Sequence, residues 1–237
     1  MSAWFAPAWS DPDHRAWVVA RCDGPGADAE ILHRGRNTVW AETCGDEAVV
    51  CKRFGRGNVW KRLAAPLRQA KSVRSAILAA AMRSRGIDSP EPLAAVDNLL
   101  VCRRVQAVGC AGDLQDPATP QRDERLRALG AFLARCRVAG VRHRDCNGGN
   151  ILALAWEPPA FTCIDTNRVS LESRALLPWF WTMLRLGFHD AASATPLLEG
   201  FGADAGQQRL YHRLSRLQRT WWWLRSTTRP LRRRLGT

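Results

Sequence analysis

Short apolar runs in the first half of the chain predict strands. The stretch "VWAETCGDEAVVCKRF" (39–54) has two apolar runs on either side of the turn signal "CGDE", with Lys52 near the end of the second run. Two such runs around a Gly-containing turn are typical of a β-hairpin. A Pro-broken loop, "DSPEPLAAV", and "NLLVCRRV" then predict another strand pair. We therefore expect a β-rich N-terminal part whose first hairpin carries a lysine.

Helical spacing follows these strands. Residues 48–87 hold ten Lys or Arg and no acidic residue, and the second half of this span, "KSVRSAILAAAMRSRG", has helical spacing that stops at Gly86. From Arg122, apolar residues recur at intervals of three and four until Gly140, the pattern of an amphipathic helix. The chain from Ala175 onward is helical in pattern. Strands thus come first and helices later.

A second hairpin is expected between the helices. The runs "ILALAW" and "AFTCID" are joined by the turn "EPP" and lead from Asn150 to Asp165. The most linker-like stretch is "QAVGCAGDLQDPATPQ", so the lobe boundary is placed near Val105. The pattern predicts an α+β protein with a small β-rich lobe (1–105) and a larger, mostly helical lobe (106–237) around a cleft.

Composition narrows the class of protein. The chain has 237 residues, 46% of them hydrophobic, and a net charge of +13, which predicts an anionic partner such as nucleic acid, a membrane surface or a phosphorylated small molecule. No signal peptide is evident, and the ten-residue run "ALLPWFWTML" is too short to span a bilayer. The eight cysteines have no zinc-like spacing and predict reduced, mostly buried thiols, so Cys146 is given no role.

The stretch "HRDCNGGN" (143–150) has the spacing of a phosphoryl-transfer loop. Such chemistry needs a carboxylate beside the attacking hydroxyl, oxygen ligands for magnesium and a cation for the phosphates. Asp145 is the candidate base, and Asn150 and Asp165 are the candidate metal ligands. Lys52 is the candidate phosphate-binding cation, on a strand of a chain whose usual cation is arginine. The order of these residues is that of the kinase signature.

These residues resemble the protein-kinase-like superfamily, and within it the bacterial lipopolysaccharide kinases of the heptose and Kdo type, over about residues 32–190. "HRDCNGGNIL" and "FTCIDTNRV" are similar to that family's catalytic loop and metal-binding segment, and "GRNTVW" to its nucleotide loop, which implicates Gly35 and Asn37 in nucleotide binding. The resemblance implies a bilobal kinase that uses ATP and Mg²⁺ to phosphorylate a sugar of the lipopolysaccharide inner core. It also implies a cytoplasmic location, peripheral on the inner membrane.

Several motifs depart from the protein-kinase pattern. "HRGRNTVW" has a single glycine in place of G-x-G-x-x-G, and the metal segment reads Asp-Thr-Asn with no A-P-E sequence after it, which argues against a protein substrate. The basic span 48–87 contains no glutamate to pair with Lys52. Glu42 and Glu91 are the two candidates for this pairing.

Three further residues support the loop. His143 is either a proton acceptor or a group that holds the backbone, and the second role is favoured. Arg144 and Arg168 either bind a substrate phosphate or pair with carboxylates, and the sequence favours neither.

The C-terminal segment 207–237 contains nine arginines and no acidic residue. It is either a helix packed on the large lobe with a solvated arginine face, or also a membrane-surface element. The helical stripe expected to define its apolar face consists of Leu210, Leu214, Leu217, Trp221 and Leu224. Expected partners are the lipopolysaccharide acceptor and the anionic inner-membrane surface, with no nucleic acid.

The sequence is also compatible with two functions other than that of a lipopolysaccharide kinase. A small-molecule kinase of the aminoglycoside or choline type shares the motif order, but the positive charge disfavours its cationic substrates. A noncatalytic nucleic-acid-binding module would use the same charge, but most of the aromatic residues that would stack on bases cluster at the C-terminal end.

Overall fold

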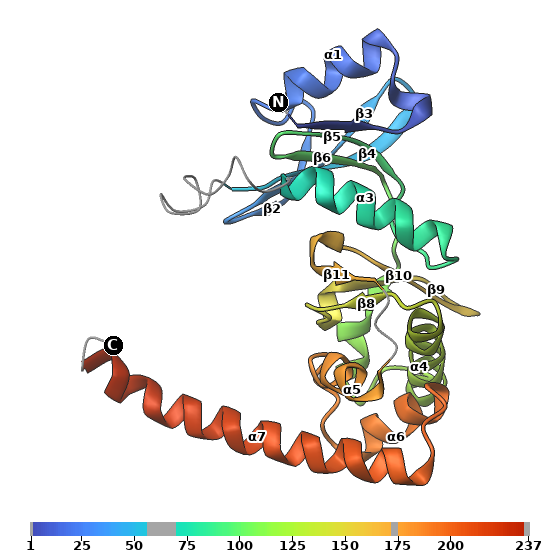
Figure 1. The fold of residues 1–237 in the computed structure, drawn as a ribbon, viewed down its shortest axis with the longest axis vertical. Coiled ribbons are helices and arrows are strands. Elements are labelled where there is room, and N and C mark those ends of the chain that lie inside the picture. The colour runs from blue at the N-terminus through green and yellow to red at the C-terminus, as the bar shows by residue number, and fades with distance from the viewer. Residues whose placement is uncertain (1, 56–69, 172–174, 235–237) are drawn as a thin grey trace.

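The chain forms two lobes, stacked one above the other in Figure 1. A computed structural model describes residues 2–55, 70–171 and 175–234, with side chains up to residue 220. The middle of the basic span 48–87, and the side chains of the C-terminal segment beyond residue 220, lie outside the described residues.

The N-terminal lobe is built on one antiparallel sheet of six strands in the order β1-β5-β6-β4-β3-β2. The predicted hairpin is confirmed, because Thr38 pairs with Arg53 and Cys44 with Glu47 around the predicted turn. The second predicted strand pair is also present, as β5 and β6. The strands are β1 (Ala3–Phe5), β2 (Glu30–Arg34), β3 (Thr38–Cys44), β4 (Glu47–Arg53), β5 (Pro92–Val96) and β6 (Leu99–Arg103).

Two helices cover opposite faces of this sheet (Figure 1). The helix α1 (Pro12–Arg21) packs Val18 against Trp40 and Cys51, and α3 (Lys71–Ser84) packs against the other face. Because side chains alternate along a strand, Lys52 faces α3 while its neighbour Cys51 faces α1. The predicted basic helix is therefore the one that lies beside Lys52.

The C-terminal lobe is mostly helical and carries two small sheets. The helix predicted from Arg122 is α4 (Arg122–Val138), and the predicted second hairpin is β9 (Ile151–Trp156) with β10 (Pro159–Cys163). The other elements are β7 (Gly109–Cys110), β8 (Arg142–His143), β11 (Val169–Ser170), α5 (Leu176–Leu184), α6 (Ala191–Gly200) and α7 (Ala205–Arg234).

The stretch expected to be a linker is instead packed against the C-terminal lobe, so that prediction is wrong. It contains β7, which pairs with β9, and a 3-10 helix, Ala111–Gln115, whose Ala111 and Leu114 are fully buried. Its Gly, Asp and Pro residues indicate turns but not whether those turns are buried. The segment packs against the loop 143–150 rather than joining two independent bodies.

The long helix α7 runs along the bottom of the C-terminal lobe and projects away from it (Figure 1). Tyr211 and Ser215 make its buried face, and the Tyr211 hydroxyl donates a hydrogen bond to the Phe188 carbonyl (3.0 Å). Leu210 and Leu217, from the predicted apolar stripe, are 40% and 64% exposed. The stripe is therefore not the main packing face. Within the described residues, every helix is too short or too polar to span a bilayer.

The contact between α4 and α6 depends on two glycines. A Cβ added at Gly130 would lie 2.1 Å from the Leu197 carbonyl oxygen, and one at Gly200 would lie 1.9 Å from the Arg127 carbonyl oxygen. Real Cβ atoms do not approach backbone so closely, so any side chain at either position would push the helices apart.

We expect Gly130→Ala to lower the free energy of unfolding by about 2 kcal/mol or more, because the added methyl overpacks this contact. Chemical denaturation followed by circular dichroism measures the change. Ala131→Ser on the same helix is the matched control and should change stability by less than about 0.5 kcal/mol. Equal stability of Gly130→Ala and wild type would show that α4 and α6 are not packed this closely.

Candidate active site

The loop "HRDCNGGN" begins as a strand and ends as a single helical turn. β8 pairs with β11 through His143 and Val169, and the 3-10 helix Gly148–Asn150 leads directly into β9. A Cβ at Gly148 would lie 2.5 Å from Gly112 Cα. Glycine is therefore required there, because the loop packs directly on the backbone of the segment expected to be a linker.

His143 holds two parts of the site together. Its ring is buried, and Nε2 lies 2.9 Å from the Ile164 carbonyl oxygen and 3.2 Å from that of Asp165, so it donates to this backbone. Burial lowers the pKa of His143 and outweighs the opposing effect of these hydrogen bonds. A neutral histidine that bonds the backbone fits the favoured structural role.

A hydrogen bond within the loop joins Asp145 and Asn150. The Asn150 amide donates to the Asp145 carbonyl oxygen (2.7 Å), so the Asn150 side-chain oxygen remains as the acceptor for a ligand. The Asp145 carboxylate is 39% exposed and 3.6 Å from Arg168 and from Arg185. This carboxylate is open to a substrate hydroxyl.

Asp165 is held in a left-handed backbone conformation (φ 56°, ψ 51°) at the end of the second hairpin. Its Oδ1 accepts a hydrogen bond from the side-chain amide of Asn167 and lies 2.6 Å from Lys52 Nζ. A non-glycine residue in this region is uncommon and must be held by its surroundings. Lys52 and Asp165, 113 positions apart, therefore meet across the two lobes.

Neither glutamate considered as a partner for Lys52 contacts it. Glu42 lies on the α1 face of the sheet, where its Oε2 accepts from Arg21 Nε (2.7 Å). Glu91 pairs with Arg103 (2.9 Å). In the described residues the acidic partner of Lys52 is Asp165.

The helix α3 contacts the predicted metal-binding segment through a hydrogen bond between neutral groups. The Thr166 hydroxyl, buried next to Asp165, donates to the Ser75 carbonyl oxygen of α3 (2.9 Å). Sequence reasoning missed Thr166 and Asn167, although both directly follow Asp165. A threonine in place of the usual Phe of the kinase segment was the available signal.

A cavity of about 640 Å³ lies between the lobes. Lys52, Asn150 and Asp165 share its wall, with Val39 and Val50 from the sheet above and Leu152 and Ile164 from below. A volume of this size, mostly apolar with a few convergent polar groups, is typical of a small-molecule site. The walls suit a flat base between the apolar side chains and phosphates beside Lys52.

The predicted nucleotide-loop residues lie beside this cavity but not in its lining. Gly35 and Asn37 form the β2–β3 turn, and the Asn37 side-chain oxygen accepts from the Gly55 amide (3.2 Å). Leu32 and His33 of β2 line the cavity instead. Asn37 therefore ties its turn to the end of β4, and contact with a nucleotide remains a prediction for both residues.

The predicted magnesium ligands fit that ion. A carboxylate on Asp165 and a free amide oxygen on Asn150 share one cavity, and Mg²⁺ prefers such oxygen ligands, few in number, with the rest supplied by water and phosphates. Among the described residues no three His, Cys, Asp or Glu side chains gather into a denser metal cluster. These two side chains would hold the ion, with water and phosphates as its other ligands.

The remaining candidates lie near Asp145. Arg144 and Arg168 are exposed, and Arg144 donates its backbone amide to the Arg168 carbonyl (3.0 Å). Cys146 is fully buried, and burial raises the pKa of its thiol, so it packs as a neutral group as expected. Arg185, which sequence reasoning missed, reaches the loop from the end of α5.

Comparison with solved structures finds the same fold in proteins of low sequence identity. WaaP in complex with acyl carrier protein matches with a TM-score of 0.56 and 14% identity, covering 91% of this chain and 98% of that one. The Rio2 kinase–ADP/Mg²⁺–phosphoaspartate complex from Chaetomium thermophilum matches with a TM-score of 0.50 and 19% identity, covering 87% and 75%. No known family profile and no curated protein matches the sequence. The predicted α+β, bilobal protein-kinase-like fold is thus confirmed.

Proposed function

We propose that this protein transfers the γ-phosphate of ATP to a sugar hydroxyl, heptose or Kdo, of a lipopolysaccharide inner core. The observation that carries the proposal is the convergence of Lys52, Asn150 and Asp165 on one cavity, with Asp145 linked to Asn150 by a hydrogen bond through its carbonyl oxygen. The sugar acceptor rests on the resemblance of "HRDCNGGNIL" and "FTCIDTNRV" to the lipopolysaccharide kinases.

Each residue has one task in this reaction. The hydroxyl oxygen of the acceptor bonds to the γ-phosphorus, and Asp145 accepts the hydroxyl proton. The bond between the γ-phosphorus and the bridging oxygen breaks, and that oxygen leaves with ADP. Lys52 neutralises the nonreacting phosphates. Mg²⁺, when bound, supplies charge neutralisation on the transferred phosphate. Asn150 and Asp165 would hold the ion, and His143 keeps their two loops in register through its hydrogen bond to the Ile164 carbonyl.

We also propose that the protein works in the cytoplasm at the surface of the inner membrane, where a lipid-anchored acceptor lies. On α7, Arg209, Arg213 and Arg216 are exposed next to the exposed Leu210 and Leu217. Leucines beside arginines on a free helix face are typical of interfacial helices.

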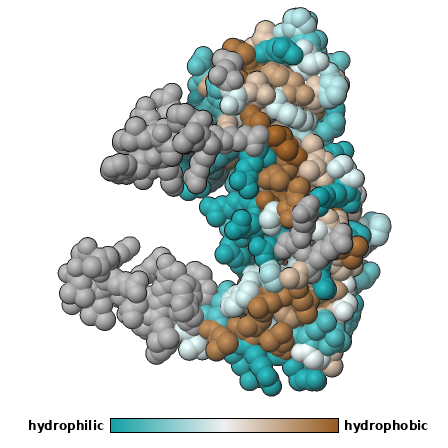
Figure 2. Space-filling model, viewed as in Figure 1, coloured by the Kyte–Doolittle hydropathy of each residue, from teal (hydrophilic) through white to brown (hydrophobic). Residues whose placement is uncertain are grey.

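The helix α5 adds exposed apolar groups to the same lobe. Leu177 and Trp181, one helical turn apart, are 50% and 43% exposed. Figure 2 shows hydrophobic surface in the lower part of the molecule, over α5. Tryptophan favours the headgroup region of a bilayer, so the exposed Trp181 also suits a membrane surface.

A protein is the alternative occupant of the basic face of α7, because the similar WaaP structure is a complex with acyl carrier protein. Two measurements distinguish these occupants. Binding to lipid vesicles indicates a membrane surface, and coelution with acyl carrier protein in the absence of lipid indicates a protein.

Asp145→Ala and Asp165→Ala should each lower phosphoryl transfer at least about a hundredfold, because one removes the base and the other a metal ligand. Transfer of labelled phosphate from ATP to purified core lipopolysaccharide measures the loss, and circular dichroism checks the fold. Asp28→Ala, an exposed aspartate far along the chain from the site, is the control. Near wild-type transfer by either folded variant would remove that residue from the reaction.

Lys52→Arg should impair activity about as much as Lys52→Ala, at least about tenfold, because a planar guanidinium cannot replace a compact ammonium between phosphates and Asp165. Thermal stabilisation by ATP with Mg²⁺, titrated against wild type and both variants, measures nucleotide binding separately. An active Lys52→Arg variant would show that Lys52 acts only as a general positive charge.

Binding to anionic vesicles should be salt-sensitive and should be lost when Arg209, Arg213 and Arg216 become glutamine. Each arginine near an anionic surface contributes about 1 kcal/mol, so the triple variant loses about 3 kcal/mol. Cosedimentation measures binding, and Arg15, Arg74 and Arg83, changed together to glutamine, remove the same charge elsewhere as the control. Equal loss in both triple variants would show that net charge and not α7 attracts the protein.

A further inference from the structure

Arginines from three elements surround Asp145. Arg168 Nε lies 3.6 Å from Asp145 Oδ2, and Arg185 Nη1 lies 3.6 Å from Oδ1. Arg185 also donates to the Arg144 carbonyl oxygen (2.9 Å). Together with Arg142 these residues form what we call the arginine cluster: Arg142, Arg144, Arg168 and Arg185.

The cluster holds more positive charge than Asp145 neutralises. Both ion pairs are longer than a charge-assisted hydrogen bond, and both arginines are more than half exposed. Burial lowers the pKa of Arg142, and repulsion from Arg144 and Arg185 lowers it further. Within the part of the chain that the structure describes, Arg142 and Arg144 form no ion pair. The buried Arg142 Nε also has no hydrogen-bond partner there. Like charges gathered in this way are stabilised by a bound anion.

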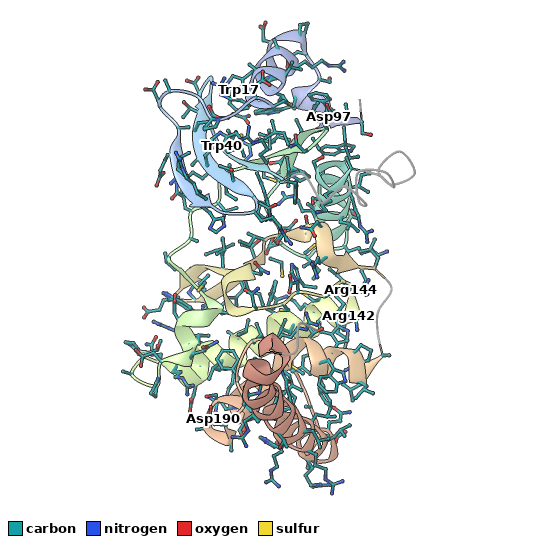
Figure 3. All side chains as sticks on the ribbon, turned by 90° about the vertical axis from the view of Figure 1, so that its left-hand side faces the viewer. Trp17, Trp40, Asp97, Arg142, Arg144 and Asp190 are labelled. Atoms are coloured by element: carbon teal, nitrogen blue, oxygen red, sulfur yellow. The ribbon has the colours of Figure 1, made fainter. Side chains whose placement is uncertain are left out.

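The cluster lies outside the lining of the nucleotide cavity, which contains Asn150 and Asp165. Figure 3 shows Arg142 and Arg144 one above the other on a single side of the C-terminal lobe, well separated from Asp190. In Figure 2 the left-hand margin of the molecule between the lobes is hydrophilic and lies above the hydrophobic surface over α5. The positive charge therefore lies outside the cavity lining and beside the Asp145 carboxylate.

We propose that the arginine cluster binds an anionic group, phosphate or carboxylate, that the acceptor carries close to the hydroxyl to be phosphorylated. This inference rests on the proposed function. The guanidinium groups of Arg168 and Arg185 exchange their long contacts with Asp145 for bidentate contacts with the acceptor anion. The exchange frees the Asp145 carboxylate to take the hydroxyl proton. Arg144 contributes charge without touching the base.

Binding of inorganic phosphate tests the cluster without any turnover. With the nucleotide site saturated by ADP and Mg²⁺, phosphate should protect wild type in a thermal-shift titration. Arg144→Gln and Arg185→Gln should weaken that binding about tenfold each, and Arg185→Lys should weaken it less. The control is Arg74→Gln, an exposed arginine on α3. Unchanged phosphate binding in both glutamine variants would overturn the proposal, even if the protein proved not to be a kinase.

Transfer kinetics then test the acceptor's charge. Wild type is compared on core lipopolysaccharide and on the same material after methyl esterification of its carboxylates and removal of its phosphates. We expect Arg144→Gln to raise the KM for the charged acceptor about tenfold, with the KM for ATP unchanged, and to have little effect on the neutralised acceptor. A fall in kcat alone, equal for both acceptors, would mean that the arginines only position Asp145. Absence of transfer to either acceptor by wild type would refute the proposed function, while the phosphate titration still decides on the cluster.

Discussion

The ion pair between Lys52 and Asp165 is the contact on which the arrangement of the cleft depends. It joins the first hairpin to the second over 2.6 Å, and both side chains are mostly shielded from water, so solvent screens the attraction only weakly. Asp165 reaches Lys52 because its backbone is left-handed and because His143 holds the preceding carbonyl. In the proposed reaction both groups change partners, Lys52 to phosphates and Asp165 to the metal. The pair keeps the two charges satisfied until a nucleotide replaces it.

The position of α3 follows from the same segment. This helix has no acidic residue, so it cannot be fixed by an ion pair with Lys52. Thr166 fixes it instead, through a hydrogen bond to the Ser75 carbonyl. A backbone acceptor is present whatever the side chain, which makes this link independent of the sequence of α3 and insensitive to charge. Two adjacent residues thus act in different ways: the left-handed backbone of Asp165 directs its carboxylate to Lys52, and Thr166 positions α3.

Local patterns predicted the elements, but contacts between distant residues required the structure. The hairpins at 39–54 and 150–165 and the helix from Arg122 follow from periodicity, which is a property of neighbouring residues. The partner of Lys52 is 113 residues away, and no pattern encodes that distance. The packing of Ala111 depends on how closely Gly112 approaches Gly148, and the buried face of α7 is set by Phe188 and His189. The helix α1 was not predicted, although "SDPDH" contains its start signal, in which Asp11 caps the helix before Pro12.

In the proposed reaction, the nucleotide and the acceptor bind in regions of different charge. Arg103 and Arg104 line the nucleotide cavity, but Glu91 and Glu30 pair with them, and Lys52 is paired with Asp165. In the proposed reaction, the cavity would therefore offer a magnesium-bound nucleotide a nearly balanced charge environment. Among the described residues, the arginines around Asp145 have only that carboxylate as an ion-pair partner, and in our proposal they bind the anion of the acceptor. In our proposal the acceptor is held by charge on one side and the nucleotide mostly by apolar walls on the other, so the hydroxyl and the γ-phosphate would meet at Asp145 without competing for one cation.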